Sequence, residues 1–330
     1  MRKQSRVLPA ILLSLVMLAA AFAARAETWP VRPVTVVMPY RAGGGGETMV
    51  RLVMQQMSQT MGQPFIIENR AGAGGTVGAG YVAKERPDGY TLLTTGLGGS
   101  VVAPVFVNAG FDAMKDFTHI ALFGGPPPAF AVNAAFPAQT VKQYIELSRG
   151  GSQGITYASS GYGTHVHLMA ELFKTLTGAS MLHVPYNGGG PAMADLVAGH
   201  VSSAFVSLGT VSQYARNGNV RLLAIASPKR VPDFPDVPTF AELGYKDMTS
   251  VTWFGLSGPA GLPRDIAVKL NAEVRAAMAK PDVLNTLAGD AIEPSNLDPD
   301  GFTQFFRAEI ERWTPLARKV HASQQPEKAK

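Results

Sequence analysis

Three glycine-rich turns contain the residues of this chain that are best suited to hold a ligand. They span residues 40–47, 157–164 and 184–192. Each turn follows a strand-like run and opens a helix-like run, which places free backbone N–H groups at the positive end of a helix dipole. Tight turns need glycine for positive φ in any case. Three turns of one type nevertheless favour contact with one small anion.

A fourth glycine-rich turn, residues 69–75, is interpreted as structural, because Asn69 and Arg70 are able to cap and brace the neighbouring turn. The second turn adds hydroxyls to its glycines. We expect Ser159 and Thr164 to share one carboxylate with the N–H groups at the helix start, and neither to act as a nucleophile.

Several enzyme signatures are incomplete. Residues 150–154 fit G-x-S-x-G but precede a strand, whereas a nucleophile elbow follows one. Residues 78–83 fit the loose dinucleotide pattern but lie a long turn away from the nearest strand. His165 and His167 are two positions apart at a helix start and cannot form the usual helical metal pair. With no clustered carboxylates either, the sequence predicts no enzyme, no metal and no cofactor.

The first 26 residues are typical of an export signal. Basic residues precede an apolar run over residues 7–23, and residues 24–26 have the small-residue pattern of a cleavage site. We expect cleavage after Ala26 and a mature chain in the periplasm. A retained membrane anchor is the alternative, but the apolar run is short for a membrane span.

The leader accounts for the apparent basicity of the chain. The sequence has 29 Lys and Arg against 24 Asp and Glu, and four of the basic residues lie in the leader. The mature chain is therefore close to neutral and has no basic stripe, which argues against nucleic-acid binding. It contains no cysteine, which excludes disulfides, zinc–thiolate sites and thiol catalysis.

Strand-like runs alternate with helix-like runs over most of the mature chain, which predicts parallel sheets covered on both faces. The expected strands are 34–39, 65–68, 90–95, 130–132, 155–158, 201–206 and 222–226. The expected helices are 49–61, 78–84, 141–149, 165–177, 191–198 and 211–218, followed by a helix-rich region over 263–320.

Two segments look like crossings between domains. The first is residues 124–133, where a proline run enters an apolar strand, and the second is the Pro-rich segment 227–238 together with the later strand 251–256. The chain would then leave one lobe, build a second and return, which creates a cleft of the kind where ligands commonly bind. We expect one lobe over 27–128 and 251–330 and the other over 129–250.

A set of motifs in the same order along the whole mature chain resembles a known family. The motifs are Pro30-x-Arg-Pro33, Pro39-Tyr40, the glycines 43–46, Gly62-Gln-Pro64, and residues 68–75, 87–93, 184–186 and 236–244. They resemble the periplasmic substrate-binding proteins of tripartite tricarboxylate transporters, the Bug-type receptors.

The resemblance implies an α/β fold of two lobes, the type II periplasmic-binding-protein or Venus-flytrap fold, in which each lobe is a mainly parallel sheet flanked by helices. It also implies a monomer that closes over a small organic acid and works with membrane permease subunits. Carried over by position, the ligand-binding residues are Tyr40, Ala42, Gly43, Gly44, Gly45, Glu47, Thr95, Gly96, Ser159, Gly161, Thr164, His165, Pro185, Tyr186 and Ser207.

Two departures from the family pattern bear on specificity. Family members typically have Thr-Asp where this chain has Gly46-Glu47, and often have Asp where it has Ser207 after Val206. Loss of that acid removes a partner for an amino group or hydroxyl, which favours a ligand that is purely carboxylate, or apolar beyond its carboxylate, over an amino acid. Two other functions stay open on sequence alone: a receptor that senses a solute for signalling, and an exported hydrolase or lyase that uses the same cleft.

Overall fold

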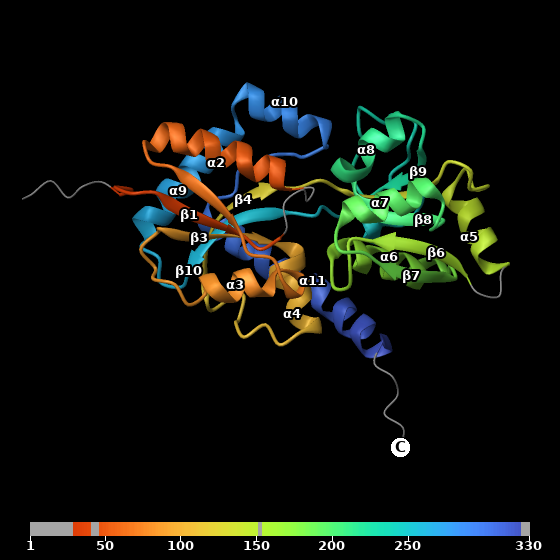
Figure 1. The fold of residues 1–330 in the computed structure, drawn as a ribbon, viewed down its shortest axis with the longest axis horizontal. Coiled ribbons are helices and arrows are strands. Elements are labelled where there is room, and N and C mark those ends of the chain that lie inside the picture. Colours follow the sequence, from red (N-terminus) through yellow and green to blue (C-terminus); the bar gives the residue numbers. More distant parts are fainter. Residues whose placement is uncertain (1–28, 41–45, 151–153, 325–330) are drawn as a thin grey trace, which may run out of the picture.

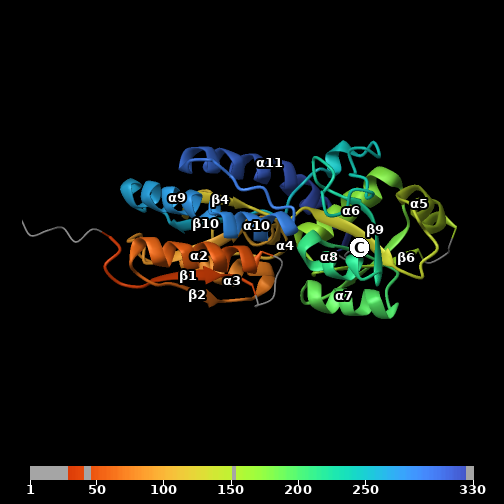
Figure 2. The same cartoon turned by 90° about the horizontal axis from the view of Figure 1, so that it is seen from above.

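The structure is a computed structural model, and it describes residues 29–40, 46–150 and 154–324. It has two lobes side by side, each built on one five-stranded sheet (Figures 1 and 2). The predicted glycines 43–45, Ala42, the leader and the end of the C-terminal tail lie outside the described residues. Within those residues, no helix is both long and apolar enough to cross a membrane.

The first sheet has the strand order β2-β1-β3-β10-β4. Helices α2, α9 and α10 cover one of its faces, and α3 and α11 lie on the other (Figure 1). The elements of this lobe are β1 Val34–Met38, α2 Glu47–Met61, β2 Phe65–Asn69, η2 Ala73–Gly75, α3 Thr76–Val82, β3 Thr91–Gly96, η3 Leu97–Val102, α4 Ala103–Phe106, β4 Phe117–Gly124, β10 Phe254–Pro259, α9 Arg264–Met278, α10 Pro281–Gly289 and α11 Pro299–Gln324.

The second sheet has the order β7-β6-β8-β5-β9. Helices α7 and α8 pack on one face, and α5 and α6 pack on the other. Its elements are β5 Pro128–Asn133, α5 Val141–Arg149, β6 Ile155–Ser159, α6 His165–Thr177, β7 Met181–Pro185, α7 Gly189–Ala198, β8 Ser203–Ser207, α8 Leu208–Arg216, β9 Val220–Ile225 and η4 Lys246–Met248.

The two-lobed α/β fold is confirmed, but the sheets are mixed rather than mainly parallel. In each sheet two neighbouring pairs are parallel and two are antiparallel. The antiparallel pairs all involve β5 or β10, the strands by which the chain enters the second lobe and returns to the first. Strands that are connected through a helix run parallel to each other, whereas a strand that enters a sheet directly from the other lobe runs antiparallel to them. The alternation of strand-like and helix-like runs in the sequence does not indicate this direction.

The second crossing also differs from the prediction. The Pro-rich segment 227–238 does not cross between the lobes, since Val231, Phe234 and Val237 pack against the core of the second lobe. Thr239 extends that lobe by a parallel bridge to Ile225 at the end of β9. The chain crosses later, over residues 250–253, where Thr252 N donates to Pro126 O of the first crossing at 2.9 Å.

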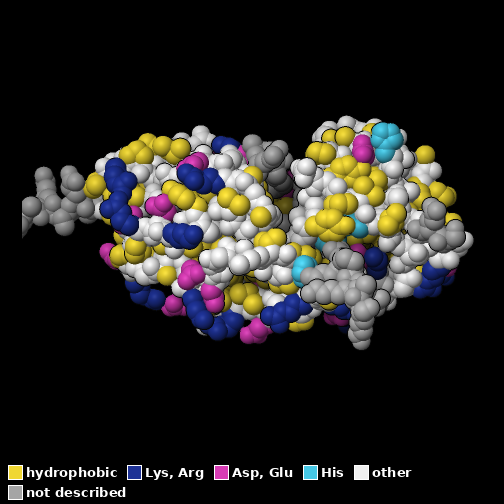
Figure 3. All heavy atoms as spheres, turned by 60° about the horizontal axis from the view of Figure 1, so that its bottom comes forward, with side chains coloured by type: hydrophobic (Ala, Val, Ile, Leu, Met, Phe, Trp, Pro, Cys, Tyr) yellow, Lys and Arg dark blue, Asp and Glu magenta, His cyan; other side chains and the backbone are white. Residues whose placement is uncertain are grey.

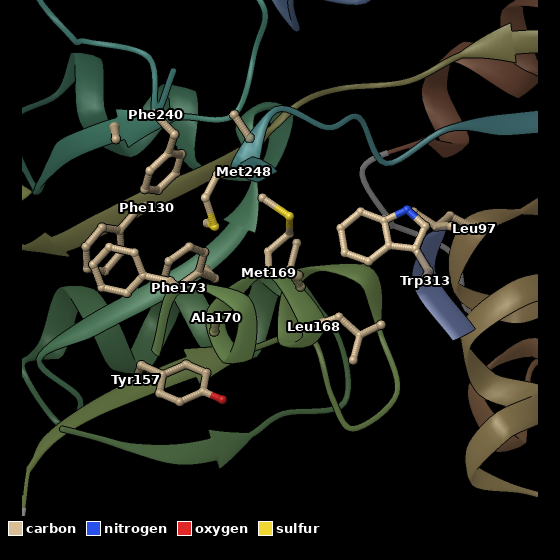
Figure 4. Packing of buried hydrophobic residues seen from close by; sticks show 14 of the residues in the cluster. Leu97, Phe130, Tyr157, Leu168, Met169, Ala170, Phe173, Phe240, Met248 and Trp313 are labelled. Atoms are coloured by element: carbon tan, nitrogen blue, oxygen red, sulfur yellow. The ribbon is translucent and has the colours of Figure 1, made fainter. Parts of the chain in front are cut away.

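One hydrophobic core runs from the second lobe into the first. Phe130 and Phe173 lie deep in the second lobe, and the same cluster continues through Met169 of α6 to Trp313 of α11 and Leu97 of η3 (Figure 4). These side chains are fully buried or nearly so. The junction between the lobes is therefore packed like a core on the α11 side.

Candidate functional site

The carboxyl ends of the parallel strands meet where the two lobes face each other. Strands β1 and β3 of the first lobe, and β6 and β7 of the second, end at the gap between the lobes (Figure 1). The surface is hollowed along this gap (Figure 3). Sheets of this kind place ligands beyond their carboxyl ends, so the turns after these strands form the candidate site.

The turn after β6 is held together by its own hydroxyls. Ser159 Oγ accepts a hydrogen bond from Gly161 N at 3.1 Å and is bonded to His183 Nε2 at 2.7 Å. Thr164 Oγ1 donates to Gly161 O at 2.7 Å and accepts from His167 N at 3.4 Å, which makes it the N-cap of α6. The two hydroxyls fix the conformation of the turn.

The turn after β7 lies directly against the turn after β6. Tyr186 N donates to Ser159 O at 3.1 Å. A Cβ on Gly161, whose φ is 127°, would come within 2.9 Å of Tyr186 O. Because L-residues rarely adopt this φ and the carbonyl fills the space, glycine is required here. The two turns therefore form one continuous wall of the second lobe.

Stacked aromatic rings support this wall. The rings of His167 and His183 stack with centroids 4.2 Å apart, and Tyr157 stacks on the other side of His183 at 4.8 Å. Burial lowers the pKa of both histidines, to about 4 for His167 and about 3 for His183. Both rings are thus neutral near pH 7, and an anion in the gap would meet dipoles here instead of imidazolium.

Two further helices of the second lobe begin without a side-chain cap. The N-cap residues are Gly188 for α7 and Ser207 for α8. Ser207 Oγ is bonded to Thr210 Oγ1 at 2.8 Å, and the Tyr186 hydroxyl donates to Asp195 Oδ2 at 2.6 Å. A helix start without a cap leaves N–H groups that need an external partner, and a carboxylate is a suitable one.

In the first lobe, Tyr40 fixes the loop after β3. Its hydroxyl accepts from Gly99 N at 2.8 Å, and burial raises its pKa to about 12. Asn69 Nδ2 donates to Tyr40 O at 2.9 Å, and Arg70 Nε is bonded to Glu68 Oε1 at 2.6 Å. The interpretation of Asn69 as a bracing residue is confirmed, whereas the side chain of Arg70 is paired with Glu68 of its own segment.

Glu47 lies in the first turn of α2 and is only 7% exposed. Its carboxylate accepts a hydrogen bond from Arg51 Nε at 2.8 Å, one turn later in the same helix, and Arg51 Nη2 is also bonded to it. The N-cap residue, Gly46, has no side-chain cap. Arg51 therefore balances the one acid that the sequence places at this helix start.

The predicted contact residues divide by exposure. Gly161, Thr164, Tyr186 and Ser207 are partly exposed and Pro185 is exposed, as a ligand contact requires. By contrast Ser159 and Thr95 are 0% and 2% exposed. Thr95 Oγ1 is bonded to Ser100 Oγ at 2.8 Å, and Gly96 lies buried against Trp253 O.

In this arrangement of the lobes the hydroxyls of Ser159 and Thr95 are bonded inside the turns. Their direct contact with a ligand stays a prediction, and so does that of His165. The His165 side chain is 1% exposed, with Nδ1 bonded to Thr252 Oγ1 at 2.9 Å and Nε2 to Ser250 Oγ at 3.0 Å. Its place at a helix start did not reveal that two hydroxyls from a distant segment would enclose it.

Tyr162 and Thr210 also lie at these turns and were not among the residues expected from the sequence. Tyr162 is 54% exposed between two glycines of positive φ, Gly161 and Gly163, and its ring edge rests on His183. The signal was available, since an aromatic residue between glycines in a ligand turn is conspicuous. Thr210 follows Ser207 by three positions, a spacing that predicts a bond between hydroxyls at a helix start.

Two cavities are lined by residues of the first lobe alone. One of about 610 Å³ lies between η3, α4 and α11, and one of about 200 Å³ lies between β4 and the starts of α9 and α11. Among the described residues, no group of three or more His, Asp or Glu side chains has the arrangement of a metal site.

Thr164→Ala is expected to weaken ligand binding by roughly fivefold to tenfold and to destabilise the fold by about 1 kcal/mol, because it removes both the cap of α6 and the clamp on Gly161. Thr140 is the matched control. It caps α5 by accepting from Gln143 N at 3.2 Å, and α5 lies at the end of the second lobe far from the gap (Figure 1). Thr140→Ala should cost similar stability and leave affinity unchanged. Titration calorimetry with chemical denaturation tests both, and equal affinity losses would contradict the assignment.

Comparisons with known proteins identify the family to which the chain is similar. The sequence model of the tripartite tricarboxylate transporter family receptors matches residues 49–321. Protein BugT of Bordetella pertussis is 33% identical over 303 residues, which cover 90% of this chain and 92% of BugT. A protein from the tcbD-tcbE intergenic region of a Pseudomonas strain is 34% identical and covers 89% of this chain and 88% of its own length.

Solved structures are similar over the same length. A Rhodopseudomonas palustris protein with adipate has a TM-score of 0.83 and 33% identity, covering 89% of this chain and 98% of that one. MatC from the same species with bound malate has a TM-score of 0.80 and 33% identity, covering 88% and 100%. The periplasmic binding protein BugD has a TM-score of 0.81 and 31% identity, covering 88% and 98%.

Proposed function

Because this chain belongs to the tripartite tricarboxylate transporter receptor family, we propose that it captures a small organic carboxylate between its two lobes and delivers it to the membrane subunits of such a transporter. The family consists of solute-binding receptors and not of enzymes. The nature of the solute, the delivery step and the residues that hold the ligand are the parts that we propose here.

The observation that carries the proposal is the set of helix starts without side-chain caps at the gap. They belong to α2 in one lobe and to α7 in the other. The start of α8 also has no side-chain cap, but the carboxylate of Asp290 lies against it, 2.9 Å from where a Cβ on Gly209 would be. Their N–H groups are suited to carboxylate oxygens, and the neutral rings behind the wall leave the backbone as the main source of positive potential. The similar R. palustris proteins with adipate and with malate support a ligand with one or two carboxylates.

We propose that Gly161, Thr164, Pro185, Tyr186 and Ser207 form the contact surface of the second lobe. In the first lobe, Tyr40 and Gly96 shape the loop that faces it, and the turn with Ala42 and glycines 43–45 is assigned from sequence alone. Glu47 is proposed as a neutralised acid beside the ligand. Arg51 already satisfies much of its charge, which disfavours an amino group on the ligand.

We propose lobe boundaries of 27–128 with 251–330 and of 129–250, cleavage of the leader after Ala26, and a periplasmic monomer. The strand membership of the two sheets supports the boundaries, since β5 belongs to one sheet and β10 to the other. The family's periplasmic relatives support the location.

A thermal-shift screen tests the proposed ligand class. A ligand that binds only the folded chain at about 100 times its Kd stabilises it by about 2.7 kcal/mol, which raises the melting temperature by several degrees. Mono- and dicarboxylates of four to six carbons, including adipate and malate, are expected to do this. Amine analogues of equal length and neutral sugars serve as controls. A shift with the controls and none with any carboxylate would sink the proposal.

A further inference from the structure

His165 joins the ligand-facing turn of the second lobe to the crossing between the lobes. It is the first residue of α6, next to the cap residue Thr164. Both of its ring nitrogens are bonded to hydroxyls of the second crossing, Nε2 to Ser250 and Nδ1 to Thr252. A neutral imidazole donates from one nitrogen and accepts at the other, and a hydroxyl does either, so both bonds are satisfied at once.

The two hydroxyls belong to opposite sides of the crossing. Ser250 N donates to Ala226 O, just after β9 of the second lobe, at 2.8 Å. Thr252 N donates to Pro126 O of the first crossing at 2.9 Å. The next residue, Trp253, is tied to the first lobe, because its carbonyl accepts from Leu97 N at 3.3 Å. The bond from His165 to Ser250 thus lies within the second lobe, whereas the bond to Thr252 connects the second lobe to the first.

Helix α11 of the first lobe packs against this junction. The Trp313 ring lies edge-on to His165 with centroids 4.9 Å apart. The indole N–H groups of Trp253 and Trp313 both donate to Oε2 of the buried Glu309, at 2.8 and 3.1 Å. Arg312 Nη2 donates to the carbonyls of Asp247 and Thr249 at 3.1 and 2.7 Å. A rotation of one lobe against the other must move His165 relative to this cluster.

We propose that His165 is a positioning residue for ligand capture, and that its bond to Thr252 couples the turn at residues 159–164 to the angle between the lobes. The bond to Ser250 moves with the turn and holds the ring in place. The bond to Thr252 is present at the lobe arrangement of this structure. A rotation that separates its two partners would lose it, so the bond stabilises this arrangement over such others. His165 acts on the ligand through Thr164 and not by contact.

Two hydroxyl deletions of similar size separate this role from a merely structural one. Thr252→Val keeps the shape of the side chain and removes the bond that connects the lobes. Ser250→Ala, the matched control, removes the other bond to the same imidazole. Replacement of His165 itself is avoided, because its burial makes loss of folding the expected result.

The readout is the distance between the lobes without ligand. Because the chain has no cysteine, Val77→Cys in α3 and Leu147→Cys in α5 accept two spin labels at exposed positions of opposite lobes. Loss of one hydrogen bond shifts a two-state ratio by about fivefold. Thr252→Val should reduce the population at the distance of this arrangement by that factor, and Ser250→Ala should leave the distribution as in the parent.

The inference rests on the proposed function only in that closure serves capture, and the distance measurement needs no ligand. If the carboxylate screen is negative but Thr252→Val shifts the distances, the coupling stands and the ligand class fails. If Thr252→Val leaves the distances unchanged, or Ser250→Ala shifts them equally, the coupling is overturned whatever binds. Where adipate or malate binds, the Kd of the Thr252→Val variant should differ from that of the parent by about fivefold. The Kd of the Ser250→Ala variant should differ from it by less than twofold.

Discussion

Acidification from pH 7 to pH 5 is expected to lower the melting temperature of this protein by about 10 °C or more. Four histidines are kept neutral in the fold. Burial is the main cause, and it lowers the pKa from the ordinary 6.5 to about 4 in His119 and His167 and to about 3 in His165 and His183. As the pH falls, the histidines of the unfolded chain therefore become protonated before those of the folded chain.

The sign of the effect follows from this difference. Well above pH 6.5 neither state is protonated at these rings and their contribution to stability is complete. As the pH falls below 6.5, only the unfolded chain binds protons, so stability decreases until the folded values near 4 and 3 are reached. Each histidine contributes a loss of roughly 1–2 kcal/mol at pH 5. The window from pH 7 to 5 lies above the ordinary range of carboxylates.

Urea denaturation at pH 7 and pH 5 measures the effect. His119→Gln keeps a polar group near Ser257 Oγ. It should reduce the difference in unfolding free energy between pH 7 and pH 5 by the amount that one histidine contributes. His200→Gln is the control, because the side chain of His200 is 70% exposed, and it should leave the dependence as in the parent. Equal stability of the parent at the two pH values would show that these rings are not held neutral by burial.

Gly125→Ala is expected to destabilise the protein by about 3 kcal/mol or more, because the added methyl group has no room. Gly125 lies in the first crossing, where a Cβ would clash with the carbonyl oxygen of Thr252 and lie 2.6 Å from its carbonyl carbon and 2.8 Å from Trp253 Cα. All three atoms are backbone and cannot rotate away. The two crossings would have to separate, which also breaks the bond from Thr252 N to Pro126 O.

Gly289→Ala is the matched control for this clash. Gly289 is the last residue of α10, and a Cβ there meets nothing within 4 Å. The same added methyl should be neutral or stabilise by about 0.5–1 kcal/mol, since alanine loses less conformational freedom than glycine in a helix. Urea midpoints followed by circular dichroism distinguish the two variants. An unchanged midpoint for Gly125→Ala would mean that the crossings tolerate separation.

Strand and helix positions followed from the sequence because they depend on local pattern. The runs that became β1, β3 and β6 are short, apolar and closed by glycine or hydroxyl residues, and each observed strand lies close to its predicted range. Helix α6 was predicted at its observed bounds, since Thr164 is a good cap and Gly178 a good stop. Strand β4 was not predicted, and β7 was expected only as a strand-like run before residue 184, without bounds.

The position of the proposed site was inferred from order along the chain. Turns after parallel strands meet at one edge of a sheet, so the turns with Gly161 and Tyr186 were expected to lie together, and Ser207 was added by the family resemblance. Which atoms of a turn face the gap did not follow. Ser159 is enclosed by His183, which is 24 residues away, and Thr95 by Ser100 across a helical bend.

The sequence by itself determined the fold class, the order of the elements and the three turns at the strand ends, because apolar periodicity and glycine placement act over a few residues. Only the tertiary structure decided the direction of β5 and β10, the packing of segment 227–238 in the second lobe and the burial of His165. These depend on pairs such as His165 with Thr252, 87 residues apart. Contacts at that separation are selected by the packing of whole lobes, and no local pattern in a single sequence records them.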